Sequence, residues 1–177
     1  FIEIYNPTAS SVNLSAGWSI QYAAEGSASW SFIPGGFTID PGEHLLVSMA
    51  SSGPGGIPLP SAEWADAGVN LAESGGKVAL VSAGGSLSGV CPSGGNIVDF
   101  VGYGNSTFYE GSSAAGYNLD PASAMFRKLG GCQDTDQNGS DFELLTPNPR
   151  NLTFPPTSCG PPPTATVEVK IGIPRFS

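Results

Sequence analysis

The chain has 177 residues, a length that suits one β-domain with short appendages. Glycine (25) and proline (16) are abundant, yet 40% of the residues are hydrophobic and 10% are aromatic, which excludes a wholly disordered chain. Six basic residues face fifteen acidic ones, for a net charge of −9, and such a surface repels phosphate backbones and anionic lipids. No apolar run approaches the ~20 residues of a membrane span, so we expect neither nucleic-acid binding nor membrane insertion.

Seven short apolar runs, separated by glycine and proline turns, predict strands. They are Phe1–Tyr5, Trp18–Ala23, Ser29–Ile33, His44–Met49, Lys77–Ser82, Ile97–Tyr103 and Ala124–Leu129. Residues 121–129 also admit a brief helix, and residues 61–72 admit a helical turn. Many short strands with such turns favour an all-β fold of the antiparallel sandwich type.

The character of the chain changes after residue 151. Residues 152–163 are rich in proline and predict a semi-rigid linker of the polyproline type. Beyond it, residues 165–173 show the strictest alternation of apolar and polar side chains in the sequence, which predicts a strand. One face of this strand carries four aliphatic residues: Val167, Val169, Ile171 and Ile173. We therefore expect a sandwich at 1–151, a linker at 152–163 and a C-terminal extension strand at 164–177.

Lysine is scarce, and serine, threonine, asparagine and glycine supply the polar surface, as is common in extracellular proteins. Sequons of the form N-x-S/T occur at four positions: Asn13, Asn105, Asn138 and Asn151. We therefore expect an extracellular or cell-surface protein with glycans on some of these asparagines.

Five motifs of the first 151 residues resemble those of one family and follow its order. The first is FIEIYNPT at residues 1–8, followed by GWSI at 17–20. The others are IDPGEHLLV at 39–47, GGKVALV at 75–81, VDFVGYG at 98–104, and CQDTD at 132–136 with PNPRN at 147–151. Together they resemble the lamin-tail domain family. The resemblance implies an immunoglobulin-like sandwich used as an interaction module, which in secreted bacterial members is often joined to nucleases, phosphatases or anchoring regions.

The three cysteines, Cys91, Cys132 and Cys159, lack the C-x-x-C spacing of zinc and thioredoxin sites. Their number alone allows one disulfide with one cysteine left over. Bacterial members of the family often carry a cysteine in the stretch that corresponds to residues 105–110, where this chain has none. The resemblance therefore implies a Cys132–Cys159 disulfide and a free Cys91.

No motif of the sequence predicts catalysis. His44 is the single histidine and lies in a strand-like run, where a structural role is the common one. The chain has neither a nucleophile elbow nor a GxxxxGK[ST] phosphate loop. Some acidic residues could pair as in a glycosidase, although each is otherwise an ordinary loop acid: Glu63, Asp66, Glu73 and Glu110. We expect a protein that is not an enzyme.

Two kinds of binding site are compatible with the sequence. A calcium loop is indicated by oxygen ligands at alternate positions around Gly139: Asp134, Asp136, Asn138 and Asp141. Leu145 stands where an EF-hand has its last carboxylate, and the alternative is a cluster of Asx turns. A surface for glycans could be formed by aromatic residues: Trp18, Trp30, Trp64, Tyr22 and Tyr109. Of these, we expect Trp18 in the core and Trp64 at the surface.

The two ends of the chain together lead to a prediction about assembly. Lamin-tail domains usually have a strand before the one that resembles Phe1–Tyr5, and nothing precedes Phe1 in this sequence. A sandwich without that strand exposes an apolar groove and open backbone hydrogen bonds, which an added strand can fill. We predict a head-to-tail extracellular homopolymer in which residues 165–173 of one copy fill the groove of the next. The alternatives are an accessory binding module of a larger secreted protein, a monomer whose own strand folds back, and an enzyme.

Overall fold

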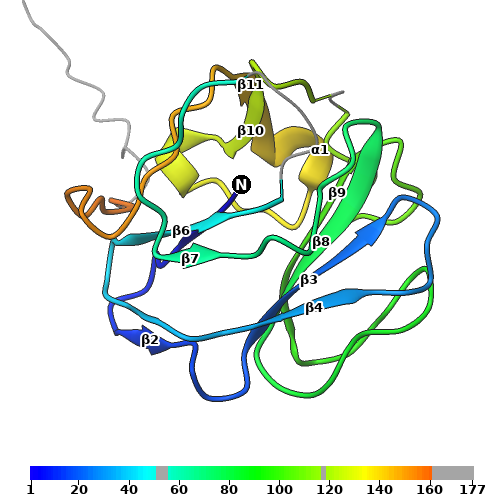
Figure 1. Cartoon of the computed structure of the whole chain (residues 1–177), viewed down its shortest axis with the longest axis horizontal. Coiled ribbons are helices and arrows are strands. Elements are labelled where there is room, and N and C mark those ends of the chain that lie inside the picture. The colour runs from blue at the N-terminus through cyan, green and yellow to red at the C-terminus, as the bar shows by residue number, and fades with distance from the viewer. Residues whose placement is uncertain (51–55, 117–118, 161–177) are drawn as a thin grey trace, which may run out of the picture.

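A four-stranded antiparallel sheet forms one layer of the computed structural model, which describes residues 1–50, 56–116 and 119–160 (Figure 1). Its strands in spatial order are β4 (Ser31–Pro34), β3 (Ser19–Ala24), β8 (Gly75–Val81) and β9 (Ile97–Gly104). Tyr22 of β3 lies opposite Val78 of β8, which lies opposite Val101 of β9. Because side chains alternate along a strand, these residues share the face that is directed toward the second layer.

The second layer is a smaller sheet with β1 at its edge. It consists of β1 (Ile2–Tyr5), β6 (His44–Ser48) and β7 (Trp64–Ala65). β1 runs antiparallel to β6, with Ile2 opposite Val47 and Tyr5 opposite His44, and β7 joins the other side of β6 in parallel. Two short strands pair separately as a ribbon: β2 (Val12–Asn13) and β5 (Thr38–Ile39).

The remaining elements of the described residues are two strands and, between them, two short helical turns. They are β10 (Ala124–Arg127), a 3-10 turn at Leu129–Gly131, α1 (Asn138–Asp141) and β11 (Phe142–Leu145). β10 and β11 pair antiparallel. Within the described ranges, no helix has the length and apolar character that a membrane crossing requires.

The main core lies between the two layers and consists of aliphatic and aromatic side chains. Its fully buried members include Ile20, Ile33, Ile39, Leu45 and Val47. The other face of the four-stranded sheet is covered as well, because Trp30 and Phe100 pack there under loops. Lys77 is fully buried on that face, where its ammonium donates to the carbonyls of Ser27 and Val90 and lies 5.2 Å from the centre of the Trp30 ring.

The architecture confirms an all-β, immunoglobulin-like sandwich, and all seven predicted strands form, some with shifted ends. Residues 121–129 contain β10 and no helix beyond the terminal 3-10 turn, and residues 61–72 contain the short strand β7. The predicted linker differs in its first part, since residues 152–159 lie against the domain through contacts described below. The C-terminal strand predicted at 164–177 lies outside the described residues.

Candidate functional site

β1 has one edge that no other strand covers among the described residues. The backbone N–H of Leu46 is directed away from β1 and donates to the carboxylate of Glu63 at 3.0 Å. In the antiparallel pattern it is therefore the neighbours of Leu46 that bond to β1, and the backbone groups of Glu3 and Tyr5 point to the open side. These groups can accept an additional strand.

An apolar cleft of about 860 Å³ lies between β1 and the edge strand β9. Its walls include inner-face residues of both layers and of β10, all only partly buried: Ile2, Ile4, Val78, Leu80, Val101 and Met125. These apolar side chains still expose part of their surface, and burying it further would stabilise the domain. The core is thus open on the same side on which the edge of β1 is open.

The outer face of β1 is covered by the segment that follows β11. Arg150 donates to Glu3 from its backbone N–H at 2.6 Å, and from Nη2 and Nε of its guanidinium at 2.6 and 3.1 Å. Nδ1 of the buried His44 lies 3.1 Å from the same carboxylate. Burial alone would raise the pKa of Glu3, but the contacts with His44 and Arg150 outweigh it and hold this pKa below its usual value. Glu3 is therefore an ionised anchor for the segment.

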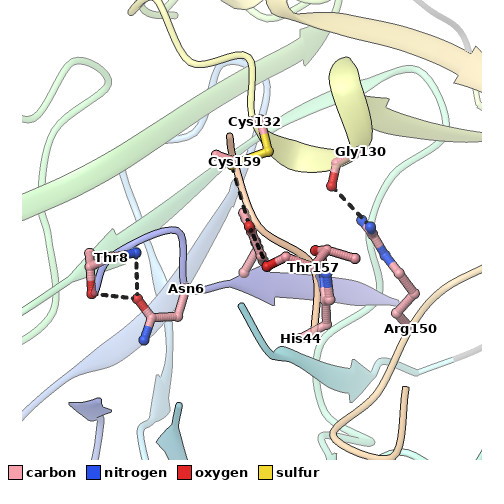
Figure 2. The surroundings of a disulfide bond; sticks show 9 residues. Asn6, Thr8, His44, Gly130, Cys132, Arg150, Thr157 and Cys159 are labelled. Carbon is pink, nitrogen blue, oxygen red and sulfur yellow. Dashed lines mark hydrogen bonds between the residues drawn. A yellow bond between two sulfur atoms is a disulfide. The ribbon is translucent and has the colours of Figure 1, made fainter. Parts of the chain in front are cut away.

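A disulfide joins Cys132 to Cys159, as Figure 2 shows. It lies beside Tyr5, the last residue of β1. The Tyr5 hydroxyl donates to the Thr157 carbonyl at 3.2 Å and lies 3.3 Å from the Cys159 sulfur. The Tyr5 ring stacks on His44, whose Nε2 lies 3.0 Å from the Thr157 hydroxyl. The predicted pairing is confirmed, and Cys91 is free and exposed. Both Tyr5 and Cys132 line the cleft, so Cys159, near the end of the described residues, lies at one end of it.

The Lamin Tail Domain family model matches residues 1–105, which include β1 to β9. The chain belongs to the lamin-tail domain family. Neither curated proteins nor solved structures give a match. In this lamin-tail domain the open edge of β1 lies inside the matched region, whereas the disulfide and the segment covering Glu3 lie beyond it. Lamin-tail domains are immunoglobulin-like and non-catalytic as a family.

The four predicted calcium ligands do not form one set. Asn138 is fully buried, with its side-chain oxygen accepting from the N–H of Gly102 and of Glu110. Asp141 is also fully buried and accepts from the N–H of Thr135 and of Gln137. Burial would raise the pKa of Asp141, but these donors lower it to about 2. Both side chains thus bind backbone N–H groups of other segments, and neither forms the Asx turn that the alternative expects.

The other two predicted ligands lie next to a residue that the sequence pattern did not contain. Oxygen atoms of Glu110, Asp134 and Asp136 lie within 4.8 Å of one another. Asp134 also accepts from Arg127 at 3.0 Å, and Arg127 forms a second ion pair with Asp99. Calcium binding at Asp134 and Asp136 stays a prediction.

The aromatic residues considered for glycan binding are distributed over both cores. Tyr22 and Trp30 are buried, and Trp18 packs against the main core as expected. Trp64 is partly buried, with its ring 6.1 Å from that of Phe37. Tyr109 is partly buried as well. A flat array of exposed rings is thus not present in the described residues, and glycan contact stays a prediction.

The residues weighed for catalysis have structural contacts. His44 is fully buried between β1 and the segment after β11. The carboxylate of Glu63 accepts the N–H of Leu46 and of Leu152, and Asp66 accepts the N–H of Val69. These side chains link loops to strands.

Burial divides the four sequons into two groups. Asn13 and Asn105 are exposed. Asn138 and Asn151 are buried, and their amide nitrogens donate to the carbonyls of Phe100 and Ser61. In the folded domain, glycosylation is therefore expected at the exposed pair only.

Proposed function

We propose that this lamin-tail domain is a non-catalytic structural subunit of an extracellular filament. In the filament, residues 165–173 of one copy add to β1 of the next copy. The observation that carries the proposal is the apolar cleft beside the open edge of β1. Strand addition needs free backbone groups and pockets for alternate side chains, and this part of the domain offers both. The disulfide is compatible with the oxidising compartment that the proposal requires.

The proposed donor strand has the pattern that the cleft requires. Every second residue of 165–173 is apolar, so one face could enter the cleft while the other remains in water. Full burial of an aliphatic side chain contributes about 1.5–3 kcal/mol, before the entropy of ordering the strand is subtracted. Because donor and acceptor are different surfaces of the same chain, each added copy leaves a new acceptor free, and the contact can propagate into a filament.

Negative-stain electron microscopy and light scattering of the purified chain test this proposal. We expect filaments from the 1–177 chain and none from a chain that ends at Thr164. The double variant Val169→Glu/Ile171→Glu should also fail to assemble, because it places two charges in the cleft. Thr166→Glu/Gly172→Glu adds the same charge on the opposite face of the strand and should still assemble. Filaments that persist in the truncated chain would refute the strand-addition mechanism.

An accessory binding module of a larger secreted protein is the second candidate. It is favoured by the chemistry of the open β1 edge, whose backbone groups accept any extended segment. On this alternative the 1–177 chain stays monomeric at every concentration, and a segment from elsewhere in the longer protein, or from a partner, covers β1. Sedimentation velocity across a hundredfold range of concentration distinguishes the two candidates.

A further inference from the structure

The geometry points to a resting state that controls assembly: before it joins a filament, each copy inserts residues 165–173 into its own cleft, antiparallel to β1. This inference rests on the proposed function, because it assumes that the cleft accepts this segment. It explains why a subunit does not polymerise as soon as it folds, because the subunit's own strand occupies the cleft. Assembly then requires that one copy's own strand leaves the cleft before a neighbour's strand enters.

The disulfide determines where the tail begins relative to β1. Cys159 is bonded to Cys132, and its sulfur lies 3.3 Å from the hydroxyl of Tyr5. Thr157 is held two residues earlier, where its N–H donates to the Gly42 carbonyl at 2.8 Å. Tyr5 is the last residue of β1, and both Tyr5 and Cys132 line the cleft. The tail therefore starts at the Tyr5 end of the open edge, and a strand that enters the cleft at this end runs antiparallel to β1.

The tether between Cys159 and the proposed strand is long enough for self-insertion. Residues 160–164 read GPPPT, and in a polyproline conformation five residues span about 15 Å. β1 has four residues, which correspond to about 13 Å of strand. The tether can thus turn at the Tyr5 end, and the nine residues 165–173 are more than enough to cover β1 along its full length.

A copy's own segment has a concentration advantage over the segment of a neighbouring copy. A segment held by a short tether beside its site has an effective concentration in the millimolar range. A neighbour's segment at micromolar concentration is therefore at a disadvantage of about a thousandfold in the same cleft. Self-insertion should dominate in dilute solution, and exchange between copies should become important only when the copies are concentrated.

Hydrogen exchange of backbone amides in the full 1–177 chain tests the inference. The amides to follow are those of Glu3 and Tyr5, which lie on the open edge, with the amide of Leu45 as an internal reference because it faces β1. The sample is kept at a concentration where sedimentation shows a monomer. We expect the Glu3 and Tyr5 amides to exchange at least about tenfold more slowly than in the Val169→Glu/Ile171→Glu variant, with the Leu45 amide unchanged.

The outcomes separate this inference from the proposed function. Slow exchange in the monomer that is lost in the double variant supports self-insertion. Fast exchange in the monomer with slow exchange in filaments overturns self-insertion and leaves the proposed function intact. Fast exchange in the monomer with no filaments at any concentration overturns both. Slow exchange that the double variant retains also overturns both, because a segment other than residues 165–173 then covers β1.

Discussion

At the scale of single residues, the Asn138 side chain hydrogen-bonds to the edge of β9 in the way that a neighbouring strand would. Its side chain accepts from the N–H of Gly102 at 2.8 Å and donates to the Phe100 carbonyl at 3.0 Å, so it pairs with the outer edge of β9. Asn138→Ala leaves these buried groups unsatisfied and should lower the free energy of unfolding by about 3 kcal/mol in urea denaturation. The exposed Asn105→Ala should change it by less than about 0.5 kcal/mol. A loss below about 1 kcal/mol for Asn138→Ala would contradict this role.

Glu110 should make stability depend on pH. Burial, followed by the nearby carboxylates of Asp99 and Asp134, raises the pKa of Glu110 from 4.5 to about 7. Between these two values the unfolded chain releases a proton that the folded domain retains, so stability should fall as pH rises through this window. Glu110→Gln removes the titration and should flatten the fall, measured as the change in melting temperature with pH. The exposed Glu73→Gln should retain the wild-type slope, and an equal slope in both variants would count against the prediction.

At the scale of elements, the Cys132–Cys159 disulfide fastens the segment after β11 to the outer face of β1. The two cysteines are 27 residues apart, and closing a loop of this length in the unfolded chain stabilises a domain by about 3.5 kcal/mol. Cys132→Ser/Cys159→Ser should lower the free energy of unfolding by about this amount. Cys91→Ser changes a free, exposed thiol and should have no measurable effect. Equal stabilities of the oxidised wild type and the double variant would show that Arg150 and Thr157 alone hold the segment.

The sequence predicts some elements well and others poorly. It predicts an element well when the pattern that determines its structure lies within the element itself. β3, β6, β8 and β9 were predicted because alternation and turn residues are contained within each run. Proline-rich composition is a local signal as well, and it predicts a linker at residues 152–163, of which residues 152–159 lie against the domain. Their true environment depends on partners more than a hundred residues away, such as Gly42 and Tyr5, which both bond to Thr157.

The predicted site shows the same limit. An alternation of Asp and Asn is compatible with a calcium loop and with Asx turns, and only the fold shows that Asn138 and Asp141 are directed into the domain. The Cys132–Cys159 pairing was obtained from the family resemblance, because three cysteines alone allow any pair. The cleft had a sequence signal only through the expectation that β1 lies at an open edge.

At the scale of the whole molecule, the chain has an apolar cleft beside β1 and a C-terminal segment whose alternating pattern matches it. The two belong to one chain, so the molecule contains both parts of a strand-addition contact. Insertion in the same copy gives a monomer, and insertion in the next copy gives a filament. Both states depend on one interaction, which is the binding of residues 165–173 to the cleft beside β1.

Titration calorimetry with a synthetic peptide of residues 164–174 measures that interaction directly. The acceptor is the chain that ends at Thr164, in which the cleft cannot be filled by its own tail. We expect saturable one-to-one binding with a dissociation constant on the order of 1 μM. We also expect that binding is lost for a Val169→Glu/Ile171→Glu peptide and kept for a Thr166→Glu/Gly172→Glu peptide. Equal binding by the two variant peptides, or no binding by the native one, would contradict the central claim.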